Sequence, residues 1–357
     1  DATGLSEESG PWSWWQMGLF GLIVLLALFM RLWQFAELPF GTWYDEAEAG
    51  LATLRILQSE NYWPIYSGSI NAPAHYLYLI AFFFHYVDVS TQSIRLVSVV
   101  MGVGMVGAAY LVGRELMGRL WGLAFAFLMA VARWGVNFSR IGIYNISTPF
   151  FELLTIGLLL RAFRRGRYLD YVLAGLALGF GLCFYVAFQL FVGMVLLFGV
   201  LVSLLQRGFL RRTWSGFLLM VVTAALVVMP AATFAYSNPD LYFSRAKGTS
   251  IFTDKTPLPD LPPLLQHYCP QLAPDWAARC QQLPRLWENA RKHLLMFNYQ
   301  GDPNGRHNLP GEPMLDNSMA ALLVLGVGVC LLRFWRPRAL LLLLWLGLTI
   351  KLYIKIQ

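Results

Sequence analysis

Three carboxylates lie close together directly after the first apolar segment of the chain, at Asp45, Glu46 and Glu48. A carboxylate at a boundary between water and lipid is partly desolvated, and desolvation raises its pKa. Such a group suits a general base or a metal ligand. We interpret Asp45 and Glu46 as candidate catalytic residues. The alternative is an acidic start to a solvated surface helix over 47–58, whose dipole favours negative charge near Asp45.

A second and a third group of polar residues follow the carboxylates. His75 lies just after Pro73, where a short apolar stretch begins. Arg140 lies in the run Ser139-Arg-Ile-Gly-Ile-Tyr144, ahead of another apolar segment. We interpret both as candidates for binding a substrate or a lipid phosphate. The alternatives are an aromatic belt at the headgroup level for His75 and an interfacial arginine that reaches towards headgroups for Arg140.

A fourth group lies in the glycine- and proline-rich run 299–313, which contains Asp302, Arg306 and His307. A guanidinium group binds a phosphate through two parallel hydrogen bonds, so Arg306 is a candidate phosphate ligand. The alternative is a turn-rich loop that only leads the chain back into an apolar segment.

Four cysteines are present, and Cys183 and Cys330 lie in apolar segments. Cys269 and Cys280 lie near one another in a polar stretch, where a disulfide and two free thiols are both open. No CxxC zinc spacing and no glycine-rich phosphate loop occurs in the sequence. Whether a divalent metal takes part stays open.

The composition shows what must position these residues. Of the 357 residues, 57% are hydrophobic and 13% are charged, against about 25% charged in soluble domains. So little polar surface cannot cover a soluble globule. The sequence therefore predicts an integral membrane protein, excludes most classes of soluble enzyme, and gives no reason to expect a nucleic-acid partner.

A membrane-spanning helix needs roughly 20 mostly apolar residues. The segments that meet this requirement are 17–35, 94–113, 119–136, 146–163, 169–185, 187–205, 214–236, 318–335 and 338–356. We expect an all-α polytopic membrane protein of about nine transmembrane helices. The stretch 73–87 is shorter and ambiguous.

Arginine-rich connections decide the expected topology, because short cytoplasmic loops carry an excess of Lys and Arg. These connections are Arg114 to Arg119, Arg161 to Arg167, Arg207 to Arg212 and Arg333 to Arg338. They fall on one side only if 73–87 is a re-entrant or surface-lying helix.

The expected domains follow from this topology. They are a cytoplasmic tail over 1–16, a transmembrane module over 17–236 with a first outer loop at 36–93, a second extracytoplasmic loop over 237–317, and C-terminal transmembrane helices over 318–357.

Several motifs in this order resemble the GT-C class of membrane glycosyltransferases, and more closely its protein O-mannosyltransferase and aminoarabinose transferase branch. The motifs are Tyr44-Asp45-Glu46, the Pro73 segment, Ile94-Arg95-Leu96, Arg140, and the two large outer loops. The run 301–311 is similar to uncharacterised bacterial members. The resemblance covers nearly the whole chain.

The resemblance implies a transferase that moves a sugar from a dolichyl- or undecaprenyl-phosphate-sugar donor to a hydroxyl of a protein or glycan acceptor. Asp45 would act as the general base, with inversion at the anomeric carbon, and no cofactor beyond the lipid-linked donor is certain. The expected location is a bacterial plasma membrane, with the active face extracytoplasmic and membrane lipid around it.

The sequence departs from the family pattern at two positions and in length. Asn71 stands where relatives often have a Lys or Arg, and Asn145 where many have an acidic residue. The chain is also shorter than the family usually is, so we expect a truncated chain or a relative that has lost activity. The second hypothesis is therefore a catalytically silent subunit of a larger membrane complex. A transporter is a weaker third, because the apolar segments carry few charges.

Overall fold

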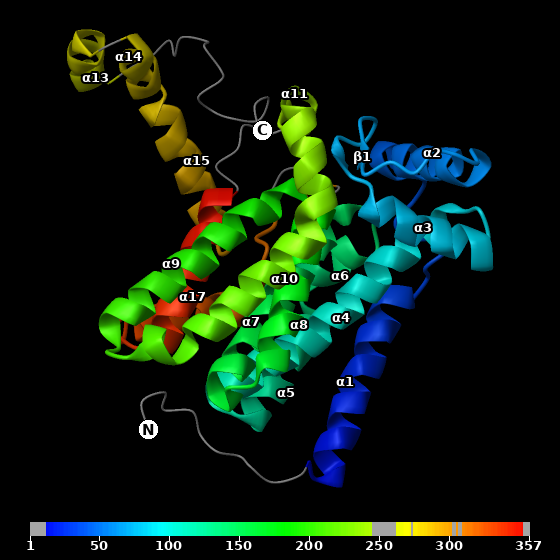
Figure 1. Ribbon diagram of the computed structural model, residues 1–357, viewed down its shortest axis with the longest axis horizontal. Coiled ribbons are helices and arrows are strands. Elements are labelled where there is room, and N and C mark those ends of the chain that lie inside the picture. Colours follow the sequence, from blue (N-terminus) through cyan, green and yellow to red (C-terminus); the bar gives the residue numbers. More distant parts are fainter. Residues whose placement is uncertain (1–11, 245–261, 273, 302–304, 306–308, 353–357) are drawn as a thin grey trace. The chain divides into compact units, whose positions relative to one another are not determined.

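The computed structural model describes residues 12–244, 262–272, 274–301, 305 and 309–352, and the chain separates into two compact units, Asp1–Pro239 and Asp240–Gln357. The α-helices that lie within the first unit are α1 (Trp14–Leu32), α2 (Tyr44–Gln58), α3 (His75–Tyr86), α4 (Thr91–Met117), α5 (Arg119–Val131), α6 (Arg133–Ser139), α7 (Ser147–Arg165), α8 (Tyr168–Phe184), α9 (Gln189–Leu205) and α10 (Phe209–Ser237) (Figure 1). Short antiparallel strands β1 (Tyr66–Ser67) and β2 (Ala72–Pro73) lead into α3.

The second unit contains the polar stretch that follows α10 and two apolar helices. Its helices are α11 (Pro239–Tyr242, at the junction), α13 (Pro263–Tyr268), α14 (Pro274–Gln281), α15 (Leu283–Met296), α16 (Asn317–Leu331) and α17 (Pro337–Leu352). A disulfide joins Cys269, just after α13, to Cys280 at the end of α14, with the two Cα atoms 5.5 Å apart. Of the two options left open by the sequence, the structure contains the bonded form.

Every predicted apolar span falls on helical structure in the described part of the chain, although the span 119–136 is divided between two helices. By length and composition, α1, α4, α7 with the preceding turn, and α10 are long enough to cross a membrane, and α5 with α6 forms a fifth, bent candidate. The helices α8, α9, α16 and α17 are apolar but shorter. The ambiguous stretch 73–87 forms α3, whose 12 residues fall well below the roughly 20 that a crossing needs.

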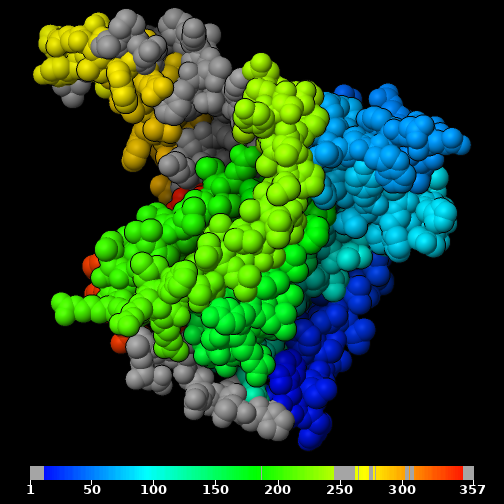
Figure 2. All heavy atoms as spheres, viewed as in Figure 1, coloured from blue at the N-terminus to red at the C-terminus, as the bar shows by residue number. Residues whose placement is uncertain are grey.

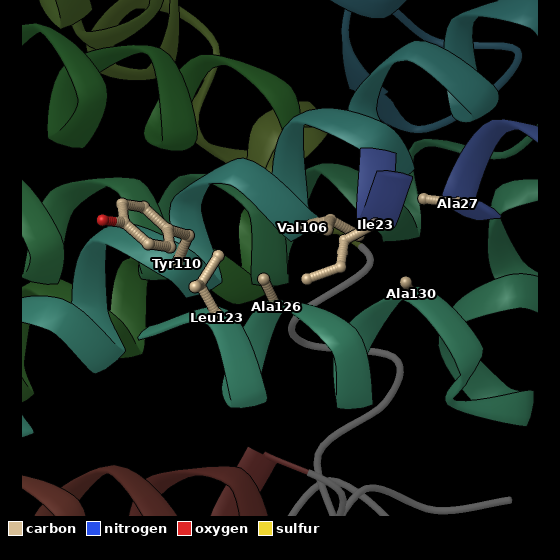
Figure 3. Close-up of a cluster of buried hydrophobic side chains, with 7 residues drawn as sticks. All are labelled: Ile23, Ala27, Val106, Tyr110, Leu123, Ala126 and Ala130. Carbon is tan, nitrogen blue, oxygen red and sulfur yellow. The ribbon is translucent and has the colours of Figure 1, made fainter. Parts of the chain in front are cut away.

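Helix α4 is the central element of the first unit, and α1, α3, α5 and α7 all pack against it. Figure 3 shows one such layer, in which α1, α4 and α5 interdigitate small and large apolar side chains. The buried members are Ile23, Ala27, Val106, Tyr110, Leu123, Ala126 and Ala130. Close packing of small residues is what holds helices together where lipid surrounds them.

The predicted span 119–136 is not one straight helix, because it breaks at Ala132 into α5 and α6 with a bend of 60°. Arg31, which projects from α1 and is completely buried, lies against this break. Its guanidinium donates hydrogen bonds to the carbonyls of Met129 and Ala130 in the last turn of α5, and to Ser139 Oγ at the end of α6. Arginine thereby satisfies helix-end carbonyls that would otherwise lack a donor.

Helices α8 and α10 lie against each other at a spacing that only glycine permits. A Cβ atom at Gly175 of α8 would lie 2.5 Å from the carbonyl oxygen of Met220 on α10, and Gly179, one turn later, is similarly close to Val227. This is the small-xxx-small pattern of membrane helix pairs. The opposite side of α10 is exposed along much of its length (Figure 2), and Leu226 and Met229 are among its exposed apolar side chains.

Replacing Gly175 with leucine should separate α8 from α10, because the new side chain overlaps backbone of the facing helix. We expect a loss of about 1–3 kcal/mol in unfolding free energy, seen as a lower midpoint of thermal unfolding in detergent. Gly193→Leu is the matched control, since nothing lies within 4 Å of a Cβ at Gly193 on α9. Equal midpoints for the two variants would contradict this packing.

Candidate functional site

The first turn of α2 carries both carboxylates that the sequence singled out. Asp45 and Glu46 follow the N-cap residue Trp43, and the Glu46 carboxylate accepts a hydrogen bond of 3.0 Å from the Trp43 backbone N–H. Negative side chains are stabilised at this end of a helix by the backbone dipoles. Asp45 is half-buried, whereas Glu46 is fully buried, so the two neighbours occupy different environments.

Glu46 forms a buried ion pair with Arg95, in the second turn of α4. Arg95 Nε lies 2.8 Å from Glu46 Oε1 and Arg95 Nη2 lies 3.0 Å from Glu46 Oε2. The same guanidinium donates to the carbonyls of Pro39 at 3.0 Å and Gly41 at 2.6 Å. The side chains of Arg95 and Glu46 are 2% and 0% exposed, so this bidentate pair fixes the segment between α1 and α2 to α4.

Gly142 completes the surroundings of the Glu46 carboxylate. Its backbone N–H donates to Glu46 Oε1 at 2.7 Å. A Cβ atom at this position would lie 2.6 Å from Ile94 Cγ2 and 3.3 Å from Glu46 Oε1, which leaves no room for a side chain. The segment after α6 is therefore held against the start of α2 by a backbone contact that depends on glycine.

The Arg140 side chain donates hydrogen bonds to backbone carbonyls at this site. Its guanidinium donates to the carbonyl oxygens of Met30 at 3.1 Å, Gln34 at 3.3 Å and Leu38 at 3.0 Å. Burial lowers the pKa of Arg140, and the positive charge of the nearby Arg95 lowers it further. The residue thus closes the loop that follows α1, a structural use that the phosphate-binding interpretation did not foresee.

His75 begins α3 and is half-buried beside the end of α8, with its ring centroid 6.2 Å from that of Phe184. Its Nδ1 atom is buried and has no hydrogen-bond partner in the structure. Burial lowers the pKa of His75, and a hydrogen bond with the Cys183 backbone partly opposes this shift. Burial therefore favours the neutral form of the ring.

Tyr76, the next residue, links α3 to the same part of α4. It is completely buried, and its hydroxyl lies 2.8 Å from Ser98 Oγ, which in turn donates to the Ile143 carbonyl at 3.3 Å. Burial and the charge of Glu46 raise the pKa of Tyr76. The first turns of α4 thus contact the segments carrying Asp45, His75 and Arg140, which are far apart in the sequence.

The backbone conformation at position 71 explains why an asparagine stands there. It ends the turn between β1 and β2 with a φ of 47°, in the left-handed region that asparagine tolerates better than most residues. A lysine or arginine there would be more strained. The departure from the family pattern at this position therefore accompanies a tight turn ahead of α3.

Some candidate residues lie beyond what the structure describes, and some important residues were not foreseen. Asp302, Arg306 and His307 lie outside the described residues. Arg95 and Gly142 were part of quoted motifs, but their contact with Glu46 joins positions far apart in sequence. Among the described residues, no three His, Cys, Asp or Glu side chains are arranged to hold a metal ion.

Known proteins share this architecture. Residues 71–234 match the family model of dolichyl-phosphate-mannose-protein mannosyltransferases. The archaeal oligosaccharyltransferase AglB from Archaeoglobus fulgidus, in complex with an inhibitory peptide and a dolichol-phosphate, superposes with a TM-score of 0.63 at 16% identity, covering 96% of this chain and 48% of that one. ArnT from Cupriavidus metallidurans superposes with a TM-score of 0.52 at 15% identity, covering 88% and 63%.

The chain therefore shares the fold of AglB and ArnT, and it spans about half the length of the AglB structures that it matches. No curated protein matches its sequence. The family match over residues 71–234 and the shared fold agree with the resemblance to GT-C membrane glycosyltransferases that the sequence indicated.

Breaking the ion pair should destabilise the whole site. Arg95→Met leaves Glu46 buried without its counter-charge, and one-sided removal of a buried pair costs about 3–5 kcal/mol. We expect a marked drop in the midpoint of thermal unfolding, and the double variant Glu46→Gln/Arg95→Met should recover part of the loss. The control is Arg55→Met, on the exposed side of α2. A double variant no better than Arg95→Met alone would contradict the pairing.

His75 should make stability depend on pH. Because its folded-state pKa lies below the ordinary value of 6.5, the folded protein binds fewer protons than the unfolded chain, and stability falls as the pH drops below 6.5. His75→Gln should flatten this part of the stability profile, measured by thermal unfolding at several pH values. His85→Gln, at the exposed far end of α3, should leave the slope unchanged; an unaltered slope in His75→Gln would refute the assignment.

Proposed function

We propose that the protein is a membrane glycosyltransferase that moves a sugar from a polyprenyl-phosphate-sugar donor to a hydroxyl of a protein or glycan acceptor. The observation that carries the proposal is the position of Asp45. It is a half-buried carboxylate in the first turn of α2, and its neighbour Glu46 is fixed by Arg95 and Gly142. A GT-C fold surrounds it.

The proposed chemistry is a single displacement at the anomeric carbon. The acceptor oxygen attacks this carbon while Asp45 takes the hydroxyl proton, and the bond to the phosphate oxygen breaks. The polyprenyl phosphate leaves with the bonding electron pair. One in-line displacement inverts the configuration of the sugar, and a positioned general base typically accelerates such a step by about 10²–10⁴-fold.

The departing polyprenyl phosphate is an anion and needs cationic side chains to bind it. The described residues of the site provide such side chains only in part. The guanidinium of Arg140 already donates to three backbone carbonyls. We therefore propose Asp302, Arg306 and His307, together with His75 and Arg140, as the residues that bind the substrate or the lipid phosphate, with Arg306 as the candidate phosphate ligand. The Archaeoglobus fulgidus oligosaccharyltransferase has been solved with Zn and sulfate, but we assign no step of this reaction to a metal.

We propose the following setting for the reaction. The membrane is a bacterial plasma membrane, the active face is extracytoplasmic, and the segment 1–16 is cytoplasmic. The transmembrane module spans 17–236, the second outer loop spans 237–317, and further transmembrane helices follow over 318–357. The arginine-rich connections on one side of the predicted helices support this orientation.

Asp45→Asn should lower transfer by at least about a hundredfold, because it removes the proton acceptor while preserving shape. The measurement is release of polyprenyl phosphate from a mannosyl or aminoarabinosyl polyprenyl phosphate in membranes that contain the protein. Glu48→Gln, a half-buried carboxylate on the same helix, is the matched control and should keep most activity. An Asp45→Asn variant with unimpaired transfer would remove Asp45 from the mechanism.

A second candidate function is a catalytically silent subunit of a larger membrane protein complex. It is favoured by the engagement of Arg140 with carbonyls and by Asn71 at a position where relatives often carry a cation. Native mass spectrometry after gentle extraction separates the two. A lone chain with a bound polyprenyl phosphate supports the enzyme, whereas stoichiometric partner chains without that lipid support the subunit.

A further inference from the structure

Four arginines lie on two neighbouring turns at one end of the first unit. Arg165 and Arg167 flank Gly166 between α7 and α8, and Arg211 and Arg212 lie in the first turn of α10; all four are exposed. A hydrogen bond of 3.2 Å between the hydroxyls of Tyr168 and Ser215 brings the two turns together. We call these four residues the arginine face.

The carboxylates at this end of the unit are already paired with other arginines. Glu115 accepts from Arg164 Nε at 2.6 Å and also pairs with Arg114, and Asp170 pairs with Arg161 Nη2 at 2.7 Å.

Glu115 and Asp170 are each only 3% exposed, so they cannot turn outward to neutralise further charges. Among the described residues, the structure pairs none of the four arginines of the arginine face with a carboxylate. Arg165 lies within electrostatic reach of Arg164, Arg161 and Arg114 as well as of Asp170, so positive charges outnumber the one carboxylate near it.

Large apolar side chains stand exposed between these charges. Leu169 is 65% exposed, Leu210 58% and Trp214 56%. Leucine and tryptophan beside arginine suit the boundary between acyl chains and headgroups, where the apolar groups enter lipid and the guanidinium groups remain at phosphate level. A soluble phosphate would gain nothing from the apolar residues, so the combination favours a lipid.

We propose that the arginine face binds the phosphate groups of anionic phospholipids on the arginine-rich side of the membrane. A guanidinium group binds phosphate through paired, charge-assisted hydrogen bonds, and basic surfaces between transmembrane helices attract anionic headgroups. In zwitterionic lipids an attached cation offsets the phosphate charge, so these bind less. This binding is independent of the proposed transfer reaction, because the arginine face and Asp45 belong to different ends of the helices.

The test compares lipids retained by the full-length protein. Protein in detergent is exchanged into an equal mixture of phosphatidylglycerol and phosphatidylcholine, and native mass spectrometry measures the ratio of the two bound lipids. The variants are Arg165→Gln/Arg167→Gln and Arg211→Gln/Arg212→Gln. The matched control, Arg55→Gln/Lys292→Gln, removes two exposed positive charges elsewhere. Thermal unfolding confirms that each variant is folded.

We expect the wild type and the control to retain phosphatidylglycerol in preference, and each arginine-face variant to lower the lipid ratio by at least about fivefold. Arg165→Lys/Arg167→Lys should retain most of the preference, because the charge remains. Equal ratios in all proteins would overturn the proposal. Displacement of phosphatidylglycerol by inorganic phosphate in the buffer would also overturn it, since the ligand would then be a soluble phosphate.

Discussion

The buried ion pair between Glu46 and Arg95 is the constraint on which the rest of the first unit depends. Removing two charges from water is costly unless nearly every donor and acceptor is used. Here the Glu46 oxygens accept from Arg95, Gly142 and Trp43, and Arg95 also donates to two carbonyls of the preceding loop. Neither residue can be satisfied unless α2, α4 and the segment after α6 are all in place, so the pair couples these elements into one arrangement.

Helix α4 carries this constraint through the membrane. Arg95 lies near its start and Glu115 near its end, twenty positions later, which at 1.5 Å per residue is about 30 Å. That is about the thickness of the hydrocarbon core. Each end therefore holds a buried ionic cluster at an expected water–lipid boundary, while the layer between them is packed with apolar and small residues. The distribution of charge along a single helix thus sets its depth in the bilayer.

Local patterns allowed most of the fold to be predicted, because a long apolar run identifies a membrane helix almost without reference to the rest of the chain. The break within 119–136 could not be foreseen, since the donor to its helix-end carbonyls is Arg31, about a hundred positions earlier in the chain. The candidate site also combines features that local sequence indicates with long-range contacts that it does not. Residue types and spacing pointed to Asp45 and Glu46, but the partner of Glu46 and the three carbonyls around Arg140 are long-range contacts. The roles of Asp302, Arg306 and His307 stay predictions.

The contacts of Glu46 also distinguish it from the adjacent Asp45 as a candidate proton acceptor. Glu46 is the counter-charge of the buried Arg95 and also accepts the hydrogen bonds from Gly142 and Trp43. A carboxylate that takes up a proton in every catalytic cycle is poorly suited to hold three elements together through its charge. Asp45 lies about 100° further round the helix and is half-buried. The proposed reaction therefore assigns the proton to Asp45, while the ion pair of Glu46 with Arg95 keeps α2 in position.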